Sequence, residues 1–282
     1  MNYNENPVDH SEKEKLPSNK ETVKPTRVNV EWFGNPSQSK YTVIFIPGIL
    51  DPSNDIAQSF YENLGGKIKI ASMGLKYNEQ QAFNLDNVIT EITAEVTKYN
   101  KPSILVGYSV GALLSLQVAK KLSYPPLGAL LIGPCIDDES VKHGFIKKLK
   151  KHPTTMERLL KVAIKARGML QPTSTKEEQY ALNQIKAVPS STELPNINYP
   201  VVVAFAKSDR YINQTHVAKI LNSKTDQYRS LKIPTKFVSN KGTGVIVGHQ
   251  LDPDKYSQLN QEILIPEITS FIPKSQTNNQ LI

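Results

Sequence analysis

Residues 103–122, SILVGYSVGALLSLQVAKKL, decide the fold of this chain. The run opens on SILV, which is typical of a strand buried on both faces of a sheet. It closes on ALLSLQVAKKL, whose apolar residues recur at helical spacing. Between the two stands Gly107-Tyr108-Ser109-Val110-Gly111. A strand that passes through G-x-S-x-G into a helix is the context of a nucleophile elbow, which holds a serine at a sharp turn above the strand end.

The chemistry of such a turn requires these residue types. Bulky neighbours would clash, so Gly107 and Gly111 must be small. The following helix points its first N–H groups at the serine, where they favour a developing oxyanion. A glycine-lined turn of a nucleotide-binding fold is the alternative. The chain contains neither G-x-G-x-x-G nor a Walker-type Gly-Lys-Ser/Thr, which disfavours it.

Short apolar runs alternate with helical patterns on either side of this stretch. Strands are expected at 27–33, 41–48, 67–74, 103–109, 127–134, 201–209 and 235–240. Helices are expected at 86–100, 112–122, 212–222 and 254–272, the last broken or kinked at Pro266. This alternation predicts an α/β fold in which a mostly parallel central sheet carries helices on both faces.

The domain organisation follows from where this rhythm stops. Residues 1–26 are polar and are expected to form a disordered arm, and 273–282 a loose tail. Residues 27–134 and 200–272 form the expected core. No strand pattern occurs in 135–199, so this insertion is expected to be a helical cap. Its expected helices are 155–167, opened by a capping box of Thr154 and Glu157, and 176–188.

A serine nucleophile needs a base, and His249 has the best position for one. It follows a glycine-rich loop after the last expected strand and precedes the closing helix. The other four histidines lie in the polar arm, in the basic part of the cap or inside an expected helix, where surface or packing roles fit better. These four are His10, His143, His152 and His216.

The imidazole also needs a carboxylate that fixes its tautomer. Asp209 ends the run VVVAFAKSD, and the order Ser109, Asp209, His249 is the order expected for a triad on this fold. Asp209 could instead cap the following helix. The alternative acids are Asp137 and Asp138, directly after LGALLIGP.

Acyl transfer further requires donors for the tetrahedral oxyanion. The backbone N–H of Val110, directly after the nucleophile, is one candidate. The other is the N–H of Ile49 in the turn Pro47-Gly48-Ile49-Leu50, where Gly48 permits a close backbone approach. The alternative for this second position is an ordinary strand–helix turn.

Strand-Pro-Gly, G-Y-S-V-G, S-D and G-H, in this order over residues 27–272, resemble the α/β-hydrolase superfamily. The resemblance implies a serine hydrolase of the esterase, lipase or thioesterase kind and identifies no subfamily. Pro47-Gly48 stands where many members have His-Gly, and no HGGG run is present, unlike in esterases of the hormone-sensitive-lipase type. A serine nucleophile points away from epoxide hydrolases and dehalogenases, which use a carboxylate.

The charge of the chain is concentrated in one segment. The formal net charge is +8, and residues 142–167 contain nine Lys or Arg and one acid, Glu157. A solvated helix face is the simplest interpretation. The alternative is a contact with anionic lipid or an acidic substrate, because Phe145, Ile146 and Leu149 alternate with lysines as in an interfacial helix.

Composition excludes several other classes of protein. The single cysteine, Cys135, rules out an internal disulfide framework and a cysteine-rich zinc site, and no metal-binding motif occurs. No apolar run approaches membrane-spanning length, and residues 1–26 lack the apolar core of a secretory signal. A cytoplasmic protein without a metal or cofactor is expected. The absence of zinc-finger spacing and RNA-binding signatures disfavours nucleic acid as a partner.

The sequence therefore predicts an enzyme that acts on a small acyl substrate. Ser109 would attack an ester carbonyl, His249 would move the proton and Asp209 would orient His249, with an acyl-enzyme intermediate. A thioesterase or acyltransferase would use the same residues. A non-catalytic relative that binds a small molecule in the same pocket is the alternative of a different class.

Overall fold

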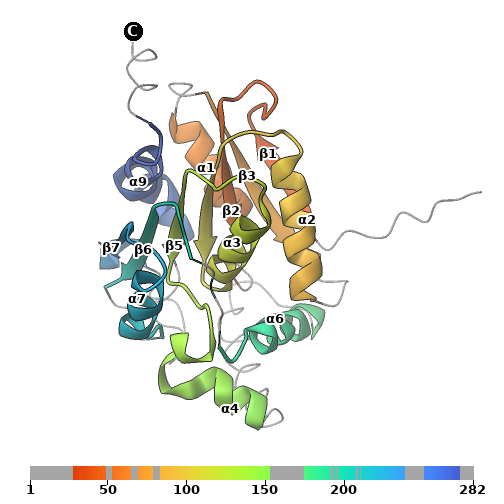
Figure 1. Ribbon diagram of the computed structural model, residues 1–282, viewed down its shortest axis with the longest axis vertical. Helices are drawn as coiled ribbons and strands as arrows, with labels where there is room; N and C mark the ends of the chain where they lie inside the picture. The colour runs from red at the N-terminus through yellow and green to blue at the C-terminus, as the bar shows by residue number, and fades with distance from the viewer. Residues whose placement is uncertain are drawn as a thin grey trace, which may run out of the picture.

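The computed structural model describes most of the expected core and part of the expected cap. The described residues are 28–48, 53–64, 69–78, 83–152, 175–191, 194, 196–207, 209, 211–238 and 251–273. They contain a seven-stranded sheet with the strand order β1-β3-β2-β4-β5-β6-β7 (Figure 1). The strands are β1 (Val28–Phe33), β2 (Tyr41–Ile46), β3 (Ile70–Tyr77), β4 (Ser103–Tyr108), β5 (Gly128–Ile132), β6 (Val201–Ala206) and β7 (Tyr228–Ile233).

The burial of each strand follows from its sequence. Every residue of β2, β4, β5 and β6 is buried, as expected of apolar runs in the centre of a sheet covered on both faces. Strand β1 alternates buried and more exposed residues and pairs with β3 antiparallel, at the edge of the sheet. All other pairs are parallel. The expected mostly parallel α/β sheet is confirmed.

Helices cover both faces of the sheet, and the sheet separates two apolar clusters. One cluster lies beneath α2 (Leu85–Thr97), α3 (Val110–Lys121) and α7 (Gln214–Asn222). The other lies beneath α1 (Ser53–Leu64), α8 (Tyr256–Leu259) and α9 (Ile265–Thr269). Because parallel strands end at the same edge, the residues that follow β2, β4, β5 and β6 meet there.

The expected cap is represented by two short 3-10 turns and two helices. The turns are η1 (Asp138–Ser140) and η2 (Lys142–Gly144), and the helices are α4 (Phe145–Lys151) and α6 (Thr175–Ala187). Helices α4 and α6 pack against each other and lie together at one end of the molecule (Figure 1). The helix expected at 155–167, the arm 1–26 and the tail 274–282 lie outside the described residues.

Strand β7 corrects the sequence prediction. The last strand was expected at 235–240, but it lies at Tyr228–Ile233 and is followed by the 3-10 turn η4 (Thr235–Phe237). Phe237 and Val238 are apolar and buried, as residues of a strand often are. This explains why the sequence predicted a strand there. The true strand is an edge strand with mixed exposure, and its sequence YRSLKI lacks a continuous apolar run.

Helix α1 was not among the helices expected from the sequence. The structure places Asp55 in its first turn. The buried residues Ile56, Ala57, Phe60 and Leu64 do have helical spacing.

The closing helix is irregular before Pro266, as expected. After the 3-10 turn η6 (Pro253–Lys255) and α8, a π-helical turn, η7 (Asn260–Leu264), precedes α9. The N–H of Ile265 bonds to the carbonyl of Asn260, five residues back. Pro266 has no N–H, so the local helical pattern changes there.

Candidate functional site

Ser109 occupies a strained turn between β4 and α3. Its φ is 54° and its ψ is −118°, and only one other described non-glycine residue, Asn100, has a positive φ. Such a conformation is unfavourable for an L-residue and is kept only where the surroundings enforce it. Ser109 is 8 % exposed, at the C-terminal end of the central strand β4. The turn therefore has the geometry that the G-x-S-x-G context predicts.

Two glycines make the turn possible. A Cβ on Gly111 would lie 2.2 Å from the carbonyl oxygen of Ile46, and a Cβ on Gly107 would lie 2.5 Å from that of Gly111. Both distances are far below van der Waals contact with backbone atoms that cannot move independently. The start of α3 therefore packs directly against the end of β2, and the sequence argument for small residues here holds.

Backbone hydrogen bonds tie this turn to the segment after β5. The N–H of Ser109 donates to the carbonyl of Ile132 at 2.9 Å, and the N–H of Cys135 donates to the carbonyl of Ser109 at 3.0 Å. The position of the serine is thus held by the end of β5 and by the segment that follows it. Val110, the first residue of α3, is 2 % exposed, and its N–H lies at the helix N-terminus.

Asp209 follows β6 and is held by the backbone beyond it. Its Oδ1 accepts hydrogen bonds from the N–H groups of Tyr211 at 2.8 Å and Ile212 at 3.0 Å. Asp209 is 5 % exposed, and these two hydrogen bonds fix the orientation of its carboxyl group. Asp209 lies at the same edge of the sheet as Ser109, because β4, β5 and β6 are adjacent parallel strands.

His249 and Ile49 lie outside the described residues, so their positions stay predictions. The chain on either side is described. Pro47 and Gly48 follow β2, next to the start of α3. Val238 and Leu251, which flank the segment with His249, form an antiparallel bridge.

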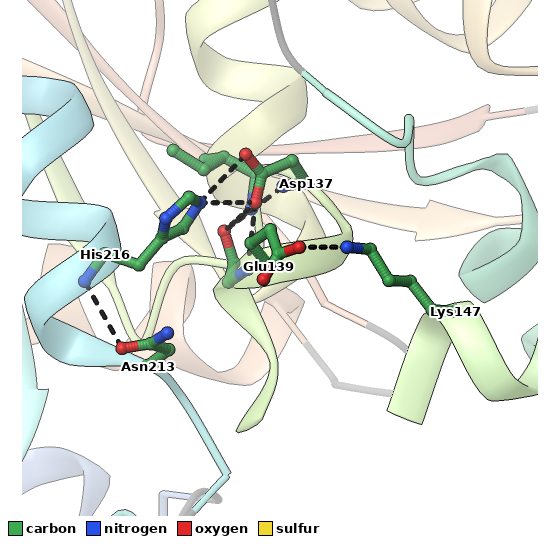
Figure 2. Close-up of polar contacts among 7 residues, drawn as sticks. Asp137, Glu139, Lys147, Asn213 and His216 are labelled. Atoms are coloured by element: carbon green, nitrogen blue, oxygen red, sulfur yellow. Dashed lines mark hydrogen bonds and ion pairs between the residues drawn. The ribbon is translucent and has the colours of Figure 1, made fainter. Parts of the chain in front are cut away.

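The two alternative acids are engaged by other partners. Both oxygens of Asp137 lie 3.0 Å from Nε2 of His216 in α7, and Asp137 Oδ1 also accepts from the N–H and hydroxyl of Ser140 (Figure 2). Asp138 Oδ1 accepts from Nζ of Lys150 at 2.8 Å. Asp137 and Asp138 therefore link the segment after β5 to α7 and to α4.

The Asp137–His216 pair was not foreseen from the sequence. His216 was expected to pack or to be solvated, and its side chain is 25 % exposed in the pair. The spacing Asp137-x-x-Ser140 is a capping-box pattern, and the structure shows both reciprocal hydrogen bonds. That spacing could have shown that Asp137 caps a turn, but no sequence signal links it to a histidine 79 residues away.

Cys135 lies beside these carboxylates and is 3 % exposed. Burial, and secondly the charges of Asp137 and Asp138, raise the pKa of its thiol to about 12. The thiol is therefore protonated at neutral pH and is not a competing nucleophile next to Ser109.

An aromatic group links the cap to the turn after β2. The rings of Tyr77, Phe83 and Tyr180 lie 5.6–6.1 Å apart, between the end of β3 and helix α6. The hydroxyl of Tyr77 donates to the carbonyl of Pro47 at 2.9 Å. The sequence analysis missed Tyr77, because its role depends on strand pairing and on the fold of the cap.

Helix α4 contains most of the described part of the basic segment, residues 142–152. Ile146 is 1 % exposed and Leu149 is fully buried, so both pack inside the protein. Lys147, Lys148 and Lys151 are exposed. These two apolar side chains are therefore not free to enter a lipid surface, and contact through the exposed lysines stays a proposal.

Comparison with known proteins supports the fold only. No family model matches the chain, and no curated protein does. Solved structures do match. A lipase-esterase related protein from Clostridium acetobutylicum ATCC 824 is 19 % identical, with a TM-score of 0.57 over 88 % of this chain and 100 % of that one. An esterase from Exiguobacterium antarcticum is 13 % identical, with a TM-score of 0.57 over 86 % and 95 %.

A thermophilic esterase from Thermogutta terrifontis is 14 % identical, with a TM-score of 0.53 over 86 % of this chain and 94 % of that one. These neighbours and the seven-stranded, mostly parallel sheet show that the chain has the α/β-hydrolase fold. The resemblance inferred from the motifs is confirmed at this level, and no subfamily follows.

None of the helices in the described residues is long and apolar enough to cross a bilayer. Within the same residues, no group of three or more His, Cys, Asp or Glu is placed to hold a metal ion.

Proposed function

We propose that the protein is a serine hydrolase that cleaves carboxylic ester bonds through an acyl-enzyme. The observation that carries the proposal is the strained conformation of Ser109 at the end of β4, with φ at 54°. The solved neighbours named above, which are described as esterases or lipase-esterase related, support ester substrates.

In this mechanism the Ser109 hydroxyl attacks the ester carbonyl while His249 accepts its proton. His249 then returns the proton to the leaving alcohol. Asp209 orients His249, and the amides of Val110 and Ile49 stabilise the oxyanion. Water, deprotonated by His249, then releases the acid and regenerates Ser109.

A fluorophosphonate probe tests whether Ser109 is activated. Intact mass should show one adduct on the native chain and none on Ser109→Ala, with Asp209→Asn labelled more slowly. An unlabelled native chain in a folded, monodisperse sample would contradict the proposal and favour a non-catalytic protein that binds a small molecule.

Thioester hydrolysis or acyl transfer is the second candidate, favoured by the exposed Lys147, Lys148 and Lys151 of α4. These lysines would attract an anionic acyl carrier such as coenzyme A. Rates on a coenzyme A thioester panel should exceed those on neutral esters of the same acyl groups, and should fall with added salt. Equal rates would argue against a role for the lysines.

A further inference from the structure

Gln184 of helix α6 is a buried amide without a hydrogen-bond partner. It is 1 % exposed, and neither its Oε1 nor its Nε2 has a partner in the structure, although other polar side chains of α6 do. A buried polar group without a partner is costly, and native proteins rarely keep one without a reason. Leu182, two residues before Gln184, and Ile185, one residue after it, are both buried. An apolar side chain at position 184 would therefore avoid the cost of an unpaired amide.

Gln184 lies in the middle of a helical segment whose two ends contact other elements of the fold. Tyr180, Gln184 and Val188 follow at intervals of four, so they share one face of the helical segment, and all three are buried. At one end, the ring of Tyr180 is 6.0 Å from that of Tyr77, the last residue of β3. At the other, the carbonyl of Val188 accepts from Lys150, which also holds Asp138 beyond β5.

The ends of the segment from Tyr180 to Val188 therefore lie near the end of β3 and near the residues that follow β5, and β2 and β4 stand between these strands in the sheet. Three strand spacings amount to roughly 14 Å, and eight helical residues span roughly 12 Å. Because the two lengths are similar, we take the midpoint of the segment to lie near the ends of β2 and β4. Those strands end at the Pro47-Gly48 turn and at Ser109. Figure 1 shows α6 at one end of the molecule beside α4.

We infer that Gln184 is a substrate-binding residue, whose carboxamide recognises a secondary amide in the acyl part of the substrate. A carboxamide has one donor group and one acceptor, and a secondary amide offers the complementary pair. In apolar surroundings such a pair discriminates strongly against a hydrocarbon, which leaves both protein groups unpaired. The inference rests on the proposed function for the identity of the reacting bond, but not for the binding of the amide.

The test uses two phenyl esters of the same shape. Phenyl N-acetyl-β-alaninate contains the amide, and phenyl 5-methylhexanoate replaces it with hydrocarbon. Gln184→Met keeps the length of the side chain and removes both hydrogen-bonding groups. Gln179→Met is the matched control, because Gln179 is exposed on the same helix. Turnover is measured on these chains, and binding by calorimetry on each of them combined with Ser109→Ala.

Native Gln184 should favour the amide ester, and Gln184→Met should lower the ratio of kcat/KM values, amide over hydrocarbon, by about tenfold or more. The ratio of affinities should fall in parallel, while Gln179→Met leaves both ratios unchanged. Because an unpaired amide is lost, Gln184→Met should also raise the Tm, which shows that the variant folds.

Ratios unaffected by Gln184→Met would overturn the inference, as would failure of the Ser109→Ala chain to bind either ester. If neither ester is hydrolysed and the fluorophosphonate does not label Ser109, the proposed function fails. The binding ratios then still decide the role of Gln184.

Discussion

At the scale of single residues, the turn at Ser109 depends on how closely backbones approach one another. A methyl group on Gly111 would overlap the Ile46 carbonyl, and neither α3 nor β2 can shift without disturbing the core. Gly111→Ala should therefore lower the free energy of unfolding by about 3 kcal/mol. Urea denaturation measures this change.

Gly144→Ala is the matched control for that variant. Gly144, unlike Gly111, has a positive φ, 58°, and a Cβ there would meet nothing within 4 Å. Its cost should be the backbone strain alone, about 1 kcal/mol. Equal losses for the two variants would contradict the packing explanation of the turn.

The raised pKa of Cys135 makes stability depend on pH in one direction. In the unfolded chain the thiol ionises near its ordinary pKa of about 8.5, whereas in the folded protein it ionises at about 12. The thiol's contribution to the free energy of unfolding is complete below the pKa of the unfolded chain. It is lost at about 1.4 kcal/mol per pH unit as the pH rises toward the pKa of the folded protein. Unfolding free energy should therefore fall between pH 9 and 10.5 less steeply in Cys135→Ala than in the native chain.

Parallel pH slopes for the two chains would contradict this assignment. The comparison between them removes the contribution of the tyrosines, which titrate in the same range. Alkylation by iodoacetamide at pH 8 provides a second measurement, and native Cys135 should react far more slowly than a free thiol.

At the scale of elements, a partly buried ion pair links α4 to the segment after β5 and to the end of α6. Lys150 of α4 joins Asp138, whose side chain is 2 % exposed, to the carbonyl of Val188 just after α6. Removing the cation leaves a buried carboxylate unpaired. Lys150→Met should cost about 2–3 kcal/mol, at the lower end of the usual range because Lys150 is 27 % exposed.

Lys147→Met on the same helix is the control. Lys147 pairs with Glu139 at the surface, where about half of each side chain is exposed, so its loss should destabilise the protein much less than the loss of Lys150. Hydrogen exchange should also show weaker protection of α4 and α6 in Lys150→Met than in Lys147→Met. Unchanged protection would mean that other contacts hold the cap.

At the scale of the whole molecule, the excess positive charge and the buried face of α4 together limit how the protein can meet a membrane. We propose that exposed lysines attract anionic vesicles without insertion, because Ile146 and Leu149 are buried. Sedimentation with phosphatidylserine vesicles should occur at 25 mM salt and be lost at about 0.5 M salt, where charges are screened within a few ångströms. Binding that survives high salt would contradict a purely electrostatic contact.

Local patterns were enough where a residue's surroundings are set by its near neighbours in sequence. The four central strands and the elbow follow from continuous apolar runs and from two glycines, Gly107 and Gly111. Strand β7 and helix α1 escaped prediction for opposite reasons. The edge strand YRSLKI buries little, so it carries no apolar signal, and α1 is as long as α3 but has a more polar sequence.

The sequence alone determined the α/β fold, the position of Ser109 after a buried strand and the chain order of Ser109, Asp209 and His249. These depend on periodicity and on short-range sterics. Only the tertiary structure decided that Asp137 pairs with His216, that Lys150 holds Asp138 and that Gln184 is buried without a partner. Each of these joins, or fails to join, groups on separate elements, and a contact across the fold exists only once those elements have packed.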